Sequence, residues 1–431
     1  MDERSSGYVT DLGYTARYHP ELNPLRAGFA FLRAGLAPPP PVATACELGF
    51  GQGVSLVVHA AASPVRWWGN DLLPEHLRFA ASLNAAAGGP ATLAEATFAE
   101  YARAPGLPAF DFIAVHGVLS WVSAENRRVI AGFLRDHLAP GGVVYTGYNA
   151  LPGWNDLVPL RQLLVAHAAR AGSGPTTDRM ETALDFAARA LEAGSATRPE
   201  VAARFARLRR EDRRYLAHEY FNRDWQPLAF TEVAELMAGA GLVPACSATL
   251  ADYLPELGLT AAQRQLLADT GDVPLRETLR DFLTGAPFRR DYWVREPRRL
   301  DRPAQDAAWR DQRVVLLTPV ARLPDRVSGP AGELRLDGPA FKAVTTLLDG
   351  MAPRTIAELE QHLAPAADDL GPITDTVFTL VALGHVAPAQ SPEAVGEVGG
   401  RVAALNRWLD ARVAGNEQIE VRANAVTGGG A

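Results

Sequence analysis

The chain has 431 residues, of which 48% are hydrophobic and 21% charged, and its formal net charge is −7. This length predicts two or three globular domains, and the negative charge gives no general attraction to nucleic acid or acidic membranes. The two cysteines, Cys46 and Cys246, exclude a disulfide framework and a cysteine-rich zinc site. The first ten residues, MDERSSGYVT, do not resemble a secretory signal, and no stretch approaches the roughly 18 apolar residues of a membrane helix. We therefore expect a cytoplasmic protein without membrane insertion.

From about residue 42 to 150, short apolar runs alternate with helix-like segments, which is typical of a parallel sheet with crossover helices. The predicted strands are Ala43–Leu48, Arg66–Asn70, Thr92–Thr97, Phe110–Val115 and Gly142–Tyr148. The predicted helices are Val54–Ala61, Pro74–Ala87 and Glu125–Leu138, the last closed by Pro140-Gly141-Gly142. This is a doubly wound α/β pattern, and such folds bind ligands at the carboxyl ends of their strands.

The next part of the chain, from Asn155 to about Tyr220, is predicted to be helical. A helix at Thr231–Gly241, a strand at Leu242–Ala248, a helical stretch at Ala261–Leu283 and a strand at Arg290–Arg295 are expected to follow. The last two strands would complete the first sheet. The helical blocks at about 155–225 and 252–287 would be insertions over its binding edge.

The character of the chain changes after the arginine-rich segment Val294–Pro303. The predicted elements here are a strand at Val314–Thr318, helices at Pro339–Asp349, Thr355–His362 and Pro372–Leu383, a short strand after Gly384 and a last helix at Arg401–Val413. Their order suggests a winged-helix-like domain. It carries 17 acidic against 12 basic residues, which favours a structural or protein-docking role over DNA binding. The final VTGGGA is expected to be mobile.

These patterns divide the chain into four parts. They are an N-terminal lid with a Rossmann-like core at 1–154, a helical insertion at 155–225, a region completing the sheet at 226–300, and the C-terminal winged-helix-like domain with its tail at 301–431.

Three alternating glycines stand where the first strand turns into a helix, in Glu47-Leu48-Gly49-Phe50-Gly51-Gln52-Gly53. Such a turn lets backbone N–H groups and the helix N-terminus face a ligand without side-chain interference. Dinucleotide enzymes use G-x-G-x-x-G, but the third glycine position here is Val54. The spacing E-x-G-x-G-x-G instead resembles the S-adenosylmethionine turn of class I methyltransferases.

A second acid, Asp71, ends the second strand 18 residues after Gly53, where a carboxylate can accept both ribose hydroxyls of a nucleoside. Leu72 follows it, and Thr97 and Phe98 end the third strand, where the adenine should lie. With no acid at that place, we expect the adenine to be bound by backbone groups. Phe98 is as compatible with a core position as with stacking.

The resemblance becomes specific in three segments: YTARYHPELNP (Tyr14–Pro24), FDFIAVHGVLSWV (Phe110–Val122) and GYNALPGW (Gly147–Trp154). They resemble a bacterial methyltransferase family that carries a methyltransferase regulatory domain and includes protein-lysine methyltransferases acting on outer-membrane proteins. RETLRDFLTGAPFRRDYWVRE (Arg276–Glu296) resembles its regulatory portion. The resemblance implies S-adenosyl-L-methionine as cofactor and a methyl acceptor that is a protein or a small molecule.

The candidate catalytic residues follow the fourth and fifth strands: His116, Trp121, Tyr148 and Asn149. His116 can orient or deprotonate the nucleophile, and a core or capping histidine is the alternative. Trp121 can wall the site or cover the sheet edge, while Tyr148 and Asn149 offer a hydroxyl and an amide.

The proposed cofactor contacts are Tyr14, Tyr18, Glu47, Gly49, Phe50, Gly51, Gly53, Asp71, Leu72, Thr97, Phe98 and His116. Tyr14 and Tyr18 lie four residues apart and would share one helical face, either as a lid or as an anchor for an N-terminal helix.

No histidine spacing indicates a metal site, so none is predicted. The arginine-rich run ARFARLRREDRRYL (Ala203–Leu216) can steer an acidic partner, but a solvated helix face is the favoured interpretation. Protein-lysine methylation is the leading functional hypothesis, and a small-molecule O- or N-methyltransferase and a non-catalytic S-adenosylmethionine-binding regulator are the alternatives. Homo-oligomerisation stays open.

Overall fold

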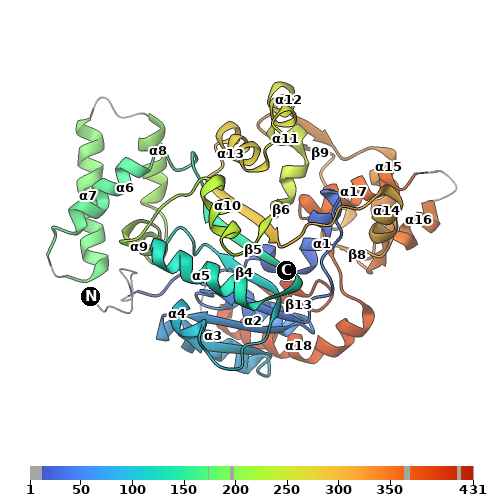
Figure 1. The fold of residues 1–431 in the computed structure, drawn as a ribbon, viewed down its shortest axis with the longest axis horizontal. Coiled ribbons are helices and arrows are strands. Elements are labelled where there is room, and N and C mark those ends of the chain that lie inside the picture. The colour runs from blue at the N-terminus through green and yellow to red at the C-terminus, as the bar shows by residue number, and fades with distance from the viewer. Residues whose placement is uncertain (1–11, 173, 195–198, 364–368, 415–418, 431) are drawn as a thin grey trace.

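The computed structural model describes residues 12–172, 174–194, 199–363, 369–414 and 419–430. A seven-stranded sheet lies at its centre in the order β3-β2-β1-β4-β5-β7-β6, with helices on both faces (Figure 1). The strands are β1 Thr44–Leu48, β2 Arg66–Asp71, β3 Ala91–Glu95, β4 Phe110–His116, β5 Leu138–Asn149, β6 Val243–Ser247 and β7 Phe288–Val294. The first five strands are parallel, and β7 runs antiparallel to both of its neighbours, β5 and β6. The prediction that two late strands complete the first sheet is therefore confirmed.

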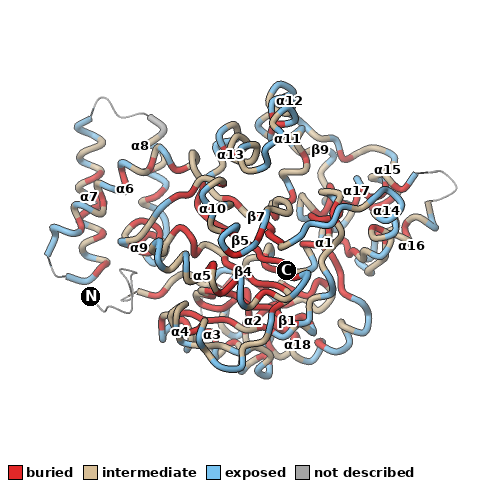
Figure 2. Tube along the Cα trace, viewed as in Figure 1, coloured by how far each residue is buried: buried red, intermediate tan, exposed pale blue. Residues whose placement is uncertain are grey.

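Side chains that alternate along the strands divide the core into two layers. Val143, Tyr145 and Tyr292 point to one layer, whereas the intervening Val144 and Trp293 point to the other. Helices α1 (Leu25–Arg33), α2 (Val54–Ala62) and α3 (Pro74–Ala86) belong to the first layer. Helices α4 (Phe98–Tyr101), α5 (Ala124–His137) and α10 (Phe230–Ala238) belong to the second. Figure 2 shows the strands as the most continuously buried part of the chain.

One predicted boundary is wrong. The Pro140-Gly141-Gly142 segment does not separate a helix from a strand, because α5 ends at His137 and β5 begins at Leu138. The early part of β5 already pairs with β4, with a register irregularity between Phe110 and Phe112 that takes up the extra residues.

Four helices after the fifth strand form a separate small core that we call the helical cap. They are α6 (Val158–Ala168), α7 (Thr176–Ala193), α8 (Pro199–Leu208) and α9 (Arg213–Phe221). Their apolar side chains pack together with Trp154. The cap lies at one end of the molecule, at the left in Figure 1.

The second helical block consists of α11 (Pro255–Gly258), α12 (Ala261–Asp269) and α13 (Val273–Thr284). The helical stretch predicted at Ala261–Leu283 is thus two helices, because Asp272 caps a new helix start by accepting from the backbone N–H of Leu275 at 2.9 Å. This block lies apart from the cap, above α10 in Figure 1.

The C-terminal part contains a three-stranded antiparallel sheet in the order β11-β8-β12 and a small hairpin. Its elements are α14 Arg302–Arg310, β8 Arg313–Leu316, β9 Arg326–Ser328, β10 Glu333–Arg335, α15 Pro339–Leu348, β11 Arg354–Thr355, α16 Ile356–Leu363, α17 Gly371–Ala382 and β12 Val386–Pro388. Its apolar residues join the same buried cluster as α1 and the first sheet face, through contacts such as the ring pair Phe29–Trp309. Its description as a winged helix stays a prediction.

The end of the chain corrects two expectations. Helix α18 spans Pro392–Ala414, longer than predicted, and packs on α2 and α3. The final glycines are bound in place: β14 (Gly429–Gly430) pairs with β13 (Ala423–Asn424), and the Gly430 N–H donates to the Tyr18 hydroxyl at 2.6 Å. Among the described helices, none combines the length and apolar character that crossing a bilayer requires.

Candidate functional site

The glycine turn joins β1 to α2, and all three glycines have a left-handed backbone, with φ of 70°, 58° and 69° at Gly49, Gly51 and Gly53. A Cβ atom on Gly49 would lie 2.8 Å from Val118, and one on Gly53 would lie 2.6 Å from Ala80. A Cβ on Gly51 would meet only Tyr14, at 4.0 Å. The outer glycines therefore permit close packing, whereas the middle one leaves the backbone open to a ligand.

Asp71, at the end of β2, is held against this turn. Its Oδ2 accepts from the Gly51 N–H at 2.8 Å, and its Oδ1 accepts from the Leu73 N–H at 3.0 Å. His76, in the first turn of α3, places Nδ1 2.9 Å from the same Oδ1. Three contacts thus fix the carboxylate at the carboxyl edge of the sheet, where the sequence predicted a ribose-binding acid.

A cavity of about 650 Å³ lies between this edge of the sheet and the helical cap. Its lining includes most of the residues proposed from the sequence: Tyr14, Glu47, Gly49, Phe50, Gly51, Gly53, Asp71, Leu72, Thr97, Phe98, His116, Trp121 and Asn149. The cap contributes α8 and α9, as expected for the first helical block. No residue of α11, α12 or α13 is in this lining, and of the second predicted block only Pro287, at its end, contributes to it, so the helices of that block do not cover the binding edge.

Tyr18 is placed differently from its prediction. The segment from Leu12 to His19 is not helical, so Tyr14 and Tyr18 do not share a helical face. Tyr14 lines the cavity and donates its hydroxyl to Glu219 at 2.9 Å. Tyr18 is absent from the lining, and its hydroxyl binds the backbone of Gly430 instead.

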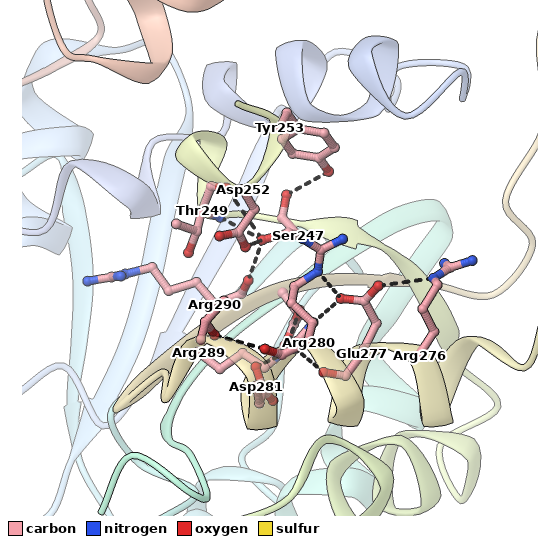
Figure 3. A network of polar contacts seen from close by, with 12 residues as sticks. Ser247, Thr249, Asp252, Tyr253, Arg276, Glu277, Arg280, Asp281, Arg289 and Arg290 are labelled. Carbon is pink, nitrogen blue, oxygen red and sulfur yellow. Dashed lines mark hydrogen bonds and ion pairs between the residues drawn. The ribbon is translucent and has the colours of Figure 1, made fainter. Parts of the chain in front are cut away.

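Tyr148 is also outside the cavity lining. It is fully buried, and its hydroxyl donates to Asp291 Oδ2 at 3.1 Å. Asp291 in turn pairs with Arg289, which also binds Glu277 and Asp281 of α13 (Figure 3). Because side chains alternate along a strand, Tyr148 faces this ion network while its neighbour Asn149 faces the cavity.

Glu47 is buried at the end of β1, and its Oε2 has no hydrogen-bond partner among the described residues. Burial, with a further contribution from the Asp71 charge, raises the pKa of Glu47 to about 8. An unpartnered carboxyl oxygen in a cavity wall is well suited to a cationic ligand, because an ammonium or sulfonium would stabilise its ionised form.

His116 closes β4 with its ring in the cavity wall. Its Nδ1 lies 2.9 Å from the Tyr145 hydroxyl, and its ring centroid lies 4.1 Å from that of His19 and 5.4 Å from that of Phe288. Burial, together with His19 and Arg290 nearby, lowers the pKa of His116 well below the ordinary imidazole value. The ring is therefore neutral near pH 7.

Several cavity residues were missed at the sequence level. His19 was considered only as a metal ligand, and Gln52, whose Nε2 donates to the Tyr14 carbonyl at 3.0 Å, was not considered. His76, also considered only as a metal ligand, lies outside the lining and binds Asp71. Nothing in the local sequence around Glu219 of the cap indicated that this residue would line the cavity. In the run Ala203–Leu216, predicted to be a solvated face, Arg204 is half-buried and Arg207 is exposed, and both line the cavity. Among the described residues, no group of three or more His, Cys, Asp or Glu side chains is arranged to hold a metal ion.

Comparison with known proteins gives a consistent result. The family model described as "Predicted methyltransferase regulatory domain" matches residues 212–295, from α9 to β7. Over 392 residues the chain is 32% identical to the uncharacterized protein sll1526 of Synechocystis sp., covering 89% of this chain and 77% of that protein. It is also 42% identical over 59 residues to the uncharacterized protein RP028 of Rickettsia prowazekii, which is 14% of this chain and 24% of that one.

Among solved structures, the fold is similar to that of PKMT2 from Rickettsia typhi in complex with AdoHcy, with a TM-score of 0.64. The two chains are 19% identical, and the similarity covers 87% of this chain and 77% of the other. The similarity extends beyond the central sheet, since it includes most of the chain.

Proposed function

The chain belongs to the class I S-adenosylmethionine-dependent methyltransferases that carry a methyltransferase regulatory domain, and we propose that it methylates lysine side chains of a protein. The observation that carries this proposal is one cavity whose lining includes the glycine turn with Asp71 and also a neutral histidine, His116, together with Asn149. The glycine turn and Asp71 suit a nucleoside cofactor, whereas His116 and Asn149 suit an amine that must lose a proton.

The residues of the nucleoside half fit S-adenosylmethionine. The open face of Gly51 leaves room against the backbone, Asp71 is placed for ribose hydroxyls, and the unpartnered Glu47 oxygen suits the ammonium of the methionine part. Thr97 and Phe98 line the same cavity, which supports the expectation that the adenine binds beside them. When bound, this cofactor supplies an electrophilic methyl group on a sulfonium.

The other half of the cavity fits a lysine side chain. A free lysine amine has a pKa of about 10.4 and must be deprotonated before it can attack a methyl group. In the tautomer that donates Nδ1–H to Tyr145, the Nε2 of His116 can accept a hydrogen bond from the amine and orient it. Trp121 and Phe288 in the same lining lower the local polarity, which favours a neutral amine.

Asn149 adds a positioning group. Its side-chain nitrogen is buried without a hydrogen-bond partner among the described residues, and the residue lines the cavity. Its backbone is held by the Ser120 hydroxyl, which accepts from the Asn149 N–H at 2.9 Å. An amide fixed in this way can orient an acceptor for in-line transfer, and alignment of that kind lowers a barrier by several kcal/mol.

A second candidate function, methylation of a small molecule, is favoured by one observation. Helices α8 and α9 contribute part of the cavity wall, so an acceptor in the cavity would contact the cap as well as the sheet edge. Concave sites of this kind are common among small-molecule enzymes.

Proteomic mass spectrometry distinguishes the two candidates. We would compare host cells that lack the protein with cells that produce the wild type or the Gly51→Asp variant. The proposal expects lysine residues whose mass increases by one CH₂ or a multiple of it only with the wild type. Identical lysine profiles in all three strains, with a methylated metabolite specific to the wild type, would support the small-molecule alternative.

A further inference from the structure

The arginine-rich run of the cap has two groups of side chains with different surroundings. Arg209 pairs with Asp185 at 2.7 Å, and Arg213 pairs with Glu181. Both of these acidic residues belong to α7. Arg204 and Arg207 instead line the cavity, together with Arg17 from the N-terminal segment. Within the described ranges, these three cavity arginines make no ion pair with a carboxylate.

The contacts of these cavity arginines are with rings and backbone. Arg204 donates to the Gly153 carbonyl at 3.1 Å, and its guanidinium lies 5.6 Å from the centre of the Trp154 ring. The guanidinium of Arg17 lies 5.3 Å from the centre of the Tyr215 ring. These contacts orient the guanidinium groups but do not neutralise them.

The acids in the same part of the lining do not cancel this charge. Glu219 accepts from the Tyr14 hydroxyl, and burial raises its pKa to about 7, so it carries only part of a charge at neutral pH. Asp224 pairs with Arg223 at 3.2 Å. Glu211, which is exposed, is the remaining acid on this side. A locally positive wall in a chain of net charge −7 therefore lies on the cap side of the cavity.

We propose that the methyl acceptor is a polypeptide segment with acidic residues beside the lysine, and that Arg204 and Arg207 bind those carboxylates. This rests on the proposed function and names the class of substrate for the same cavity. Guanidinium groups bind carboxylates through paired, charge-assisted hydrogen bonds, and such pairs are stronger in a partly enclosed site than on an open surface. The positive wall also disfavours a lysine flanked by other basic residues, which gives selectivity among lysines.

The experiment uses the full chain saturated with S-adenosylhomocysteine and two rhodamine-labelled peptides, each with a central lysine flanked by glutamate or by glutamine. Fluorescence anisotropy at low salt gives the ratio of the two affinities. We expect the wild type to prefer the glutamate peptide by about fivefold or more, and added salt to reduce this preference. The Arg204→Gln/Arg207→Gln variant should lose it, whereas the matched Arg209→Gln variant should keep it.

The exposed position of Arg207 allows a variant that does not endanger folding. Arg207→Glu should reverse the order of affinity between glutamate-flanked and arginine-flanked peptides. Equal affinities of the wild type for the glutamate and glutamine peptides would overturn the inference. The inference would also be overturned if Arg204→Gln/Arg207→Gln kept the preference for the glutamate peptide and bound S-adenosylhomocysteine more weakly. These arginines would then bind the cofactor's carboxylate.

Calorimetric titration with S-adenosylhomocysteine alone keeps the two proposals separate. Absence of that binding would contradict the cofactor site of the proposed function, whereas the peptide ratio tests the acidic acceptor by itself.

Discussion

His76 connects the carboxylate of Asp71 to the N-terminal segment: its Nδ1 lies 2.9 Å from Asp71 Oδ1, and its Nε2 accepts from the Tyr14 N–H at 3.0 Å. Since Nε2 is an acceptor, the ring proton is on Nδ1 and is donated to Asp71. The side chain is almost fully buried. His76 thus holds the proposed ribose-binding acid and the cavity-lining Tyr14 in a fixed relation.

The first prediction concerns this link. His76→Leu removes a donor to a carboxylate, and we expect it to weaken S-adenosylhomocysteine binding about tenfold or more, since hydrogen bonds to charged groups contribute about 1.5–3 kcal/mol. His76→Asn, whose amide can replace the Nδ1–H donor, should recover part of the affinity. Isothermal titration calorimetry measures both, with His362→Leu at an exposed position as control. Equal affinities of wild type and His76→Leu would contradict this role.

The second prediction tests the open face of the glycine turn. Gly51→Asp places a carboxylate where the backbone should meet the cofactor, and we expect binding of S-adenosylhomocysteine to fall below detection. Gly106→Asp is a matched control, because Gly106 also has positive φ, of 80°, and a Cβ atom on it would have nothing within 4 Å. The Gly106→Asp variant should have a similar backbone strain and should keep the wild-type affinity for S-adenosylhomocysteine. If both variants bind equally well, the cofactor does not lie against Gly51.

The third prediction follows from the pKa of Glu47, raised from about 4.5 to about 8. Between these values the folded protein holds a proton that the unfolded chain has released, so the free energy of unfolding should decrease as pH rises from about 4.5 to 8. A cationic ligand favours the ionised carboxylate, so cofactor affinity should increase with pH and level off above about 8.

Calorimetry in buffers of different ionisation enthalpy checks this mechanism. At pH 7 the wild type should release close to one proton for each S-adenosylhomocysteine bound. Glu47→Gln should release far less and show a flatter pH dependence. Proton release that is the same in both proteins would assign the effect to another group.

The fourth prediction concerns a buried ion network in which Arg289 binds Glu277, Asp281 and Asp291 at 2.7, 2.8 and 2.9 Å. Figure 3 shows Arg289 with Glu277 and Asp281. Arg289→Ala leaves these carboxyl groups without their common partner and should lower the free energy of unfolding by about 3–5 kcal/mol. Arg276→Ala, at the more exposed edge of the network, should cost less than about 0.5 kcal/mol. Urea unfolding measures both. Similar losses in the two variants would mean that Arg289 has no special structural role.

Much of the sheet and the centre of the site could be predicted from local sequence. The strands β1 and β4 are short, mainly apolar runs, and their identity depends on burial on both faces. The glycine turn requires φ values that other residues rarely adopt, so Gly49, Gly51 and Gly53 mark it without any knowledge of distant contacts. Asp71 and His116 follow from their places at strand ends, because the carboxyl ends of parallel strands meet at one edge.

Contacts between distant parts of the chain decided the rest. Tyr14 and Tyr18 have helical spacing, but the backbone around Tyr14 binds His76 and Gln52, and Tyr18 binds Gly430, so the segment stays extended over α2. The final glycines are ordered for the same reason.

The directions of side chains in the cap and on β5 could not be predicted from the sequence either. A helical run of arginines does not indicate which of them face a cavity, because that depends on how the helix is rotated against a sheet formed by other residues. Tyr148 and Asn149 are adjacent, and the ion network around Arg289 lies on one side of β5 while the cavity lies on the other. Local sequence therefore determined the glycine turn, whose geometry depends on backbone conformation alone, whereas tertiary packing decided which polar side chains line the rest of the cavity.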